Sequence, residues 1–311
     1  MINFKNFCRL IILLYIYALN LQICFSDSLS ADSQKIFKFG LMKNTFPEAN
    51  PKDAQAAFEI WVKNYLKETQ NKIRVKIVST VFEDIDSLTA ALEKKEIEFI
   101  NINTMDYFRI KEKMSISPIL VTAKQHSPTE KLLLLCSKDN NIKNVTDLVN
   151  KKIIAQKGKW DAIPAIWLET LLIKETNSSY DMNLIKLDKA SQCVYNLYFK
   201  QADACIVSAN AYSLINELNP KICLNVKVLA ESPDYLPFIF CHTDFADKNI
   251  IKLIKSTAFN FENSSYGKQI LTLFQSQKNL PVKDIYLKEI KILYDTYQRF
   301  LSENKIKKII N

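Results

Sequence analysis

Glycine is scarce in this chain of 311 residues, which contains only Gly40, Gly158 and Gly267. Dinucleotide-binding and phosphate-binding loops need several closely spaced glycines, because the backbone must approach the phosphates closely. The three positions fit neither motif. Their spacing therefore argues against the common classes of nucleotide-dependent enzyme.

Histidine is scarcer still, and its two copies, His126 and His242, lie far apart in the chain. His242 follows Cys241, but neighbouring residues of a strand point to opposite faces of the sheet, so this pair is a poor catalytic dyad. The acidic run from Glu83 to Asp86 is typical of the charged start of a helix. We therefore predict a protein that is not an enzyme and that needs no cofactor.

The chain also lacks any Cys-x-x-Cys pair, so we expect no structural zinc site. Five of its seven cysteines follow residue 26, and an odd number in an exported protein leaves at least one thiol unpaired. The sequence leaves open whether two of the others form a disulfide. The five are Cys136, Cys193, Cys205, Cys223 and Cys241.

Arginine clusters and RNA-binding signatures are absent, although the formal net charge is +9. The lysines are spread evenly along the chain, so we expect no nucleic-acid partner. Hydrophobic residues make up 48% and charged residues 24% of the sequence, which are ordinary values for a globular protein. The length is sufficient for two domains, each with its own core.

The amino terminus carries the only long apolar run. Lys5 and Arg9 precede the segment 10–19, a pattern typical of a secretory signal peptide. We predict a signal peptide over residues 1–26 and an exported protein. A lipid anchor at Cys24 is less favoured, because the bulky Ile23 precedes it. An uncleaved membrane anchor is a third alternative.

Strand and helix patterns alternate along the rest of the chain, which favours doubly wound α/β domains with largely parallel sheets. Extended breakers at residues 124–128 and 231–237 divide them. A chain that crosses to a second domain and returns has two such breakers. We therefore predict two three-layer α/β/α lobes joined by a two-strand hinge, with lobe 1 formed by residues 35–123 and 231–280 and lobe 2 by residues 124–230.

Individual elements follow from apolar periodicity. We predict a helix over 54–65 after a loop that contains Pro47 and Pro51, and we assign no element to residues 103–113. Near the carboxyl end, apolar residues spaced three and four apart predict a helix from Val282 to Asn304. We expect this segment, 281–311, to pack on lobe 1; a dimer or partner contact is the alternative.

The stretch from Ile153 to Glu175 has the pattern of strand, basic turn and amphipathic helix. Asp161 is a suitable N-cap, and Lys157 and Lys159 lie beside the free N–H groups of the first helical turn. This arrangement predicts an anion site, with an ordinary turn as the alternative. Trp160 suits stacking on a flat solute or, equally, covering the core.

Several stretches resemble the phosphonate-binding group of periplasmic solute-binding proteins of ABC transporters. The stretches are Phe37-Lys38-Phe39-Gly40, the segments 58–66 and 88–99, Asn144-Val145-Thr146-Asp147-Leu148, and the segments 198–204 and 233–238. The resemblance covers residues 35–277. It implies the type 2 periplasmic binding protein fold, in which two hinged lobes close on a small solute that is delivered to a membrane permease.

The binding residues depart from the family pattern. Where family members present a Ser-Thr-Ser run, residues 157–162 contain no hydroxyl group. The resemblance places the family's histidine at Lys189, its two acidic residues near Asn210 and Leu236, and its cleft aromatic near Asn101 or Ile102. The scaffold is therefore carried over more firmly than the specificity for phosphonates.

We hypothesise a monomeric periplasmic substrate-binding protein that takes a small polar solute, with a phosphonate-like or phosphate-like anion as one candidate, and delivers it to an ABC permease in the inner membrane. The alternative is a solute-sensing or partner-docking protein with a decayed site, for example beside a sensor kinase. No metal site is expected. The predicted ligand-binding residues are Lys157, Lys159, Trp160, Asp161, Asp86, Asn101, Asn103, Thr104, Lys189, Ser208, Asn210 and Tyr235.

Overall fold

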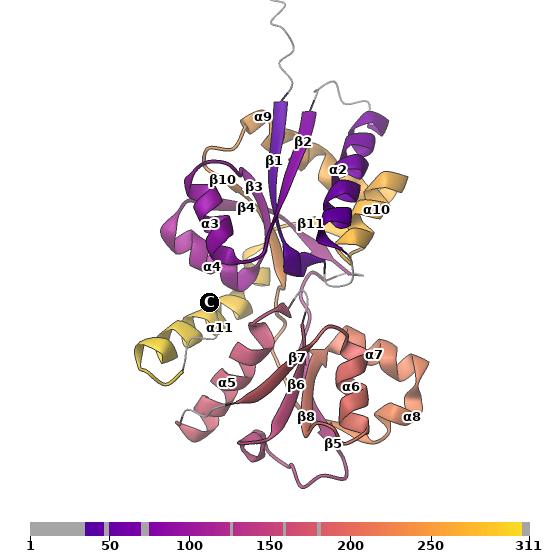
Figure 1. The fold of residues 1–311 in the computed structure, drawn as a ribbon, viewed down its shortest axis with the longest axis vertical. Coiled ribbons are helices and arrows are strands. Elements are labelled where there is room, and N and C mark those ends of the chain that lie inside the picture. The colour runs from indigo at the N-terminus through magenta and orange to yellow at the C-terminus, as the bar shows by residue number, and fades with distance from the viewer. Residues whose placement is uncertain are drawn as a thin grey trace, which may run out of the picture.

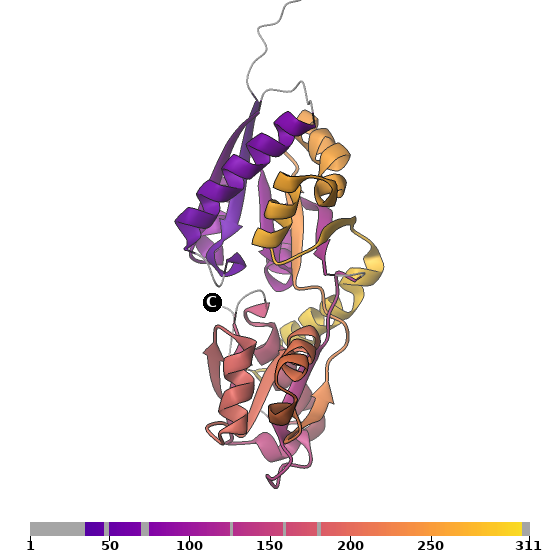
Figure 2. The same cartoon turned by 90° about the vertical axis from the view of Figure 1, so that its right-hand side faces the viewer.

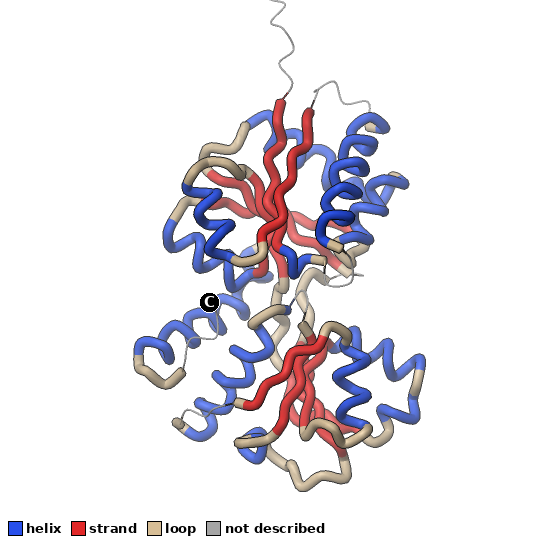
Figure 3. The backbone as a smooth tube through the Cα atoms, viewed as in Figure 1, coloured by secondary structure: helices blue, strands red, loops and turns tan. Residues whose placement is uncertain are grey.

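The computed structural model describes residues 35–46, 50–69, 75–124, 127–157, 160–178 and 182–306. The predicted signal peptide lies outside these residues. Within them, no helix combines the length and the apolar character that a membrane span requires. The described chain forms two lobes, each a sheet flanked by helices (Figures 1 and 3).

Lobe 1 contains a six-stranded sheet in the order β11-β4-β10-β3-β1-β2. Its strands are β1 (Lys35–Met42), β2 (Val75–Phe82), β3 (Phe99–Asn103), β4 (Ile116–Ala123), β10 (Phe238–Thr243) and β11 (Lys278–Pro281). β1 runs parallel to β2 and β3, whereas β10 is antiparallel to β3 and β4. The sheet is therefore mixed rather than largely parallel, because β10 re-enters the lobe from the hinge, where β3 and β4 end.

Helices cover both faces of this sheet. One face carries α2 (Pro51–Glu68), α9 (Lys248–Thr257), the short 3-10 helix η5 (Ala258–Asn263) and α10 (Ser265–Leu273). The opposite face carries α3 (Ile85–Glu93) and α4 (Thr104–Lys113), and the short helix η2 (Lys43–Thr45) follows β1. Helix α2 begins three residues before the predicted start, because Asn50 caps it by accepting the N–H of Lys52 at 2.9 Å.

Lobe 2 contains a five-stranded sheet in the order β7-β6-β8-β5-β9. Its strands are β5 (Leu132–Ser137), β6 (Lys152–Gln156), β7 (Asn183–Leu187), β8 (Ala204–Ser208) and β9 (Val226–Glu231). One face is covered by η3 (Val145–Leu148) and α5 (Ile163–Thr176), and the other by α6 (Ala190–Tyr198), α7 (Ala209–Leu218) and α8 (Pro220–Cys223). β5 enters from the hinge and is antiparallel to β8.

The apolar residues of β5 form an unbroken run because helices cover both faces of the sheet to which it belongs. Leu132 and Leu134 pack in the core cluster that contains α5, whereas Leu133 and Leu135 pack in the cluster that contains α6. Alternate side chains of a strand point to opposite faces, so a strand covered on both faces is apolar at every position.

The long carboxyl-terminal helix α11 (Asp284–Ser302) contacts helices of both lobes, α4 of lobe 1 and α5 of lobe 2. It lies beside the junction of the lobes in Figure 1. We predicted packing on lobe 1 alone. The difference arises because its apolar residues Ile290, Leu293 and Tyr297 belong to a core cluster that continues from lobe 1 into lobe 2.

Candidate functional site

Two chain crossings connect the lobes and lie side by side (Figure 2). Glu130 of the first crossing and Tyr235 of the second exchange two backbone hydrogen bonds, each 3.0 Å long. Leu132 and Ser232 are also bonded, since the N–H of Ser232 donates to the carbonyl of Leu132 at 2.9 Å. The paired crossings are the geometry that a hinge between two lobes requires.

A pocket of about 40 Å³ lies at this hinge. Its walls come from three parts of the described chain: Thr45 and Asn101 of lobe 1, Glu130 and Pro237 of the crossings, and Asn210 of lobe 2. We call it the hinge pocket. It brings together two of the predicted ligand-binding residues, Asn101 and Asn210, from different lobes.

Glu130 fixes the lobe 2 wall of the hinge pocket. It is only 7% exposed, and its Oε1 accepts the backbone N–H of Asn210 at 3.1 Å. Asn210 follows Ser208, which caps α7 by accepting the N–H of Ala211 at 3.3 Å. The Asn210 side chain itself is exposed. It is therefore placed by its backbone and remains accessible to a solute.

Asn103 and Thr104 are occupied in holding the start of α4. The side chain of Asn103 accepts the N–H of Asp106 at 2.9 Å, and its amide donates to the Asp106 carboxylate. The hydroxyl of Thr104 donates to the carbonyl of Leu236 at 2.5 Å, and its backbone N–H to that of Pro237 at 3.1 Å. These bonds attach α4 to the returning crossing.

Asp106 lies at the junction of the lobes among other charged groups. Arg109 approaches Asp106 and Asp86, with a nitrogen-to-oxygen distance of 3.8 Å in each case. Burial raises the pKa of Asp106 to about 7, the Asp161 carboxylate of lobe 2 contributes to the rise, and Arg109 opposes it. Two predicted residues, Asp86 and Asp161, thus raise the pKa of this buried carboxyl group through their negative charges.

The start of α5 differs from the prediction. Trp160 is 0% exposed and packs in the core cluster, so it covers the core as in the alternative stated for it. Asp161 is not the N-cap: it adopts a φ of 43° in a turn, and the helix begins after Ala162, which makes no side-chain capping bond. Because residues 160–162 form this turn, α5 starts later in the chain than expected.

Two of the predicted basic residues, Lys157 and Lys189, lie at the surface. The backbone N–H of Lys157 donates to the Leu187 carbonyl at 2.6 Å, and its ammonium is 3.8 Å from the carboxylate of Asp188. Lys189 is exposed at the N-cap of α6. Lys159 lies outside the described residues. Tyr235, the last of the predicted residues, is only 3% exposed and packs beside the hinge.

The sequence interpretation missed α4, and with it Asp106 and Arg109. A signal was present: Asn103 followed three positions later by Asp106 is the spacing of a helix cap, and Tyr107, Phe108 and Ile110 follow. It also missed Glu130, which no motif marks, since its role depends on the pairing of two distant crossings.

Residues 45–285 match the family model described as ABC transporter, phosphonate, periplasmic substrate-binding protein. The chain belongs to this family. The phosphonate-binding family consists of binding proteins, so the chain is a binding protein and not an enzyme. The described residues contain no group of three or more His, Cys, Asp or Glu side chains that could hold a metal ion.

Solved structures show the same fold at low sequence identity. A protein from Xanthomonas citri bound to ATP gives a TM-score of 0.67 at 9% identity, covering 88% of this chain and 100% of that one. A binding-protein component of an ABC phosphonate transporter from Pseudomonas aeruginosa gives 0.58 at 13%, covering 88% and 89%.

A further similar structure is that of PhnD1 from Prochlorococcus marinus in complex with methylphosphonate, with a TM-score of 0.56 at 15% identity, covering 88% of this chain and 99% of that one. A search of curated proteins finds no match. The predicted type 2 periplasmic binding protein fold is confirmed. Sequence identities this low establish the fold but do not identify the solute, which depends on the residues of the site.

Proposed function

We propose that this member of the phosphonate-binding family binds a small polar solute in the hinge pocket and delivers it to an ABC permease. The observation that carries the proposal is that Asn101 of lobe 1, Glu130 of the crossing and Asn210 of lobe 2 line one pocket. A solute that contacts both lobes favours the closed arrangement, because only that arrangement offers all its contacts at once.

The chemistry of the hinge pocket favours a solute with hydrogen-bonding groups. Asn101 and Asn210 supply amide donors and acceptors, and Lys124 and Glu130 supply one charge of each sign. This lining suits a neutral or zwitterionic polar group at least as well as a phosphonate. At the turn between β6 and α5, where the sequence predicts an anion site, the Lys157 side chain is 53% exposed, and residues 157–162 contain no hydroxyl group in place of the family's serines.

The predicted amino-terminal leader supports export to the periplasm, and the family supports a membrane permease as partner. We expect the protein to act as a monomer. The sensing or docking role remains the second candidate, favoured by one observation: the buried indole of Trp160 occupies the start of α5.

A thermal-shift screen tests the proposal. The mature chain, from Asp27, is heated with phosphonates, phosphate, sulfonates and small amines. We expect at least one solute to raise the melting temperature Tm, because a ligand that binds only the folded state stabilises it. The rise should be smaller in Asn210→Ala and unchanged in the control Asn219→Ala, at the other end of α7. If no solute changes Tm, the docking role is favoured.

A further inference from the structure

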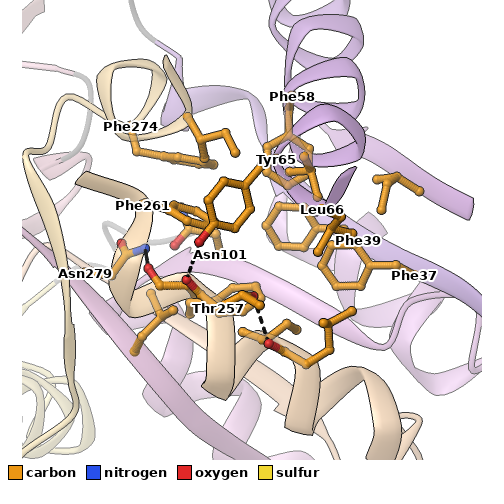
Figure 4. A pocket seen from close by; sticks show the side chains of 18 of the residues that line it. Phe37, Phe39, Phe58, Tyr65, Leu66, Asn101, Thr257, Phe261, Phe274 and Asn279 are labelled. Atoms are coloured by element: carbon orange, nitrogen blue, oxygen red, sulfur yellow. Dashed lines mark hydrogen bonds between the residues drawn. The ribbon is translucent and has the colours of Figure 1, made fainter. Parts of the chain in front are cut away.

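A second cavity, of about 100 Å³, lies inside lobe 1. It lies between one face of the six-stranded sheet and the layer formed by α2, α9, η5 and α10 (Figure 4). The strands contribute Phe37 and Phe39 of β1 and Phe240 of β10. This position is within a lobe and not between the lobes, so it is distinct from the hinge pocket.

Aromatic rings form much of the wall of this cavity. Phe58 of α2 lies 4.8 Å from Phe39 and 6.0 Å from Phe274 between ring centroids, and Phe39 lies 5.3 Å from Phe240. In Figure 4 the labelled rings approach from opposite sides, Phe37, Phe39 and Phe58 facing Phe261 and Phe274. Such a wall offers dispersion contacts and ring stacking to an apolar guest.

Tyr65 and Asn279, two polar residues of the lining, are bonded to backbone atoms. The hydroxyl of Tyr65 donates to the carbonyl of Thr257 at 2.7 Å, and the amide of Asn279 donates to that of Ala258 at 2.7 Å. Both bonds are drawn in Figure 4. Because a water molecule in a cavity needs two to four polar partners, this lining favours an apolar occupant over water.

The cavity and the hinge pocket share part of their walls. Asn101, Thr122 and Phe274 line both. We propose that the cavity binds the apolar part of an amphiphilic solute, a single ring or a short alkyl chain, while its polar end lies in the hinge pocket. This inference rests on the proposed function for the polar end. A cavity of somewhat larger size in another protein, about 150 Å³, binds benzene, which sets the scale of the guest.

Benzene is the probe for the cavity itself. At ten times its dissociation constant, it should raise Tm of the mature chain by about 3 °C. The substitution Ala258→Leu, which extends a side chain into the cavity, should abolish the rise. Leu253→Ala enlarges the cavity and should retain it, and it also admits indole. The control is Ile292→Ala, at a position of α11 that is 48% exposed and where truncation creates no cavity, which should leave the benzene effect unchanged.

Benzyl alcohol tests the connection to the hinge pocket. One added hydrogen bond in the hinge pocket should make it bind about tenfold more tightly than benzene, and Asn101→Ala should remove that gain without removing benzene binding.

Absence of a benzene effect in both the parent chain and Leu253→Ala overturns the inference, as does equal binding of the two probes. If polar solutes shift Tm through Asn210 while benzene has no effect, this inference fails alone. If benzene binds while no polar solute does, the proposed function fails instead.

Discussion

At the scale of single residues, two carboxyl groups are buried and have raised pKa values. Asp106 is 4% exposed and Glu169 of α5 is 7% exposed. Burial raises the pKa of each to about 7, from ordinary values near 4. At a pH between the ordinary and the raised pKa, the carboxyl group still holds its proton in the folded state but has released it in the unfolded state. The free energy of unfolding therefore falls as the pH rises through this range.

We therefore expect Asp106→Asn to remove part of this pH dependence. The free energy of unfolding of the parent should fall by about 2 kcal/mol per buried carboxyl group between pH 5 and pH 8. The neutral side chain that the variant carries at this position has no charge to desolvate, and its oxygen can still accept the hydrogen bond from the side-chain amide of Asn103. Urea unfolding at both pH values measures the difference. The control is Asp53→Asn at an exposed position of α2. A pH dependence unchanged from the parent would show that Asp106 is ionised throughout.

Glu169→Gln provides an independent check on the same reasoning. The Oε2 of Glu169 is buried, and no hydrogen-bond partner for it is found among the described residues. The variant should gain about 2 kcal/mol relative to the parent at pH 8 and little at pH 5. Denaturant unfolding measures it, with Glu175→Gln, exposed on the same helix, as the control. Equal effects at the two pH values would contradict the account.

At the scale of elements, α11 determines how the lobes are joined. Its buried stripe packs on α4 and α5, which places lobe 1 and lobe 2 in one core cluster. We expect Ile290→Ala to lower the free energy of unfolding by about 3 kcal/mol, because Ile290 is 0% exposed. Ile292→Ala, on the outer face at 48% exposure, should cost less than about 0.5 kcal/mol. Similar losses in the two variants would mean that α11 does not pack as described.

The sequence predicts the elements whose apolar pattern is local. The period-two and period-3.6 patterns locate most strands and helices, and the two breakers locate the crossings. Helix α4 was missed because its first two turns are buried nearly all round: the polar Asp106 is buried together with Met105, Tyr107, Phe108 and Ile110, so these turns show no polar face of helical period. The antiparallel direction of β10 depends on where the chain re-enters the lobe, which no local pattern encodes.

At the scale of the whole molecule, the described cysteines are structural. All five are free and buried, which answers the open question about a disulfide within this part of the chain. Burial raises the pKa of Cys193 to about 12 and that of Cys205 well above its ordinary value. A protonated, enclosed thiol reacts slowly, since the thiolate is the nucleophile.

We expect no thiol of the folded mature chain to react rapidly with iodoacetamide at pH 8, and all five to react in urea. Mass spectrometry of the labelled protein counts the modified thiols. Rapid labelling of one cysteine in the folded protein, or fewer than five labelled in urea without reductant, would contradict the burial or the free state.

The candidate site was predictable in part for a physical reason. Asn101 and Asn210 were placed by the resemblance of the scaffold, and both line the hinge pocket. The role of Trp160 was not predictable. An aromatic residue in a turn can stack on a solute or pack in the core, and only the packing of α4, α5 and α11 decides between these two roles.

The central claim is that one solute is held by both lobes at once. Isothermal titration of the tightest solute from the thermal screen into Asn101→Ala and Asn210→Ala tests it most directly. Each variant should bind about fivefold to tenfold more weakly than the parent, since each loses one hydrogen bond, from a different lobe. Parental affinity in either variant, with the other weakened, would show that the solute is held by one lobe alone.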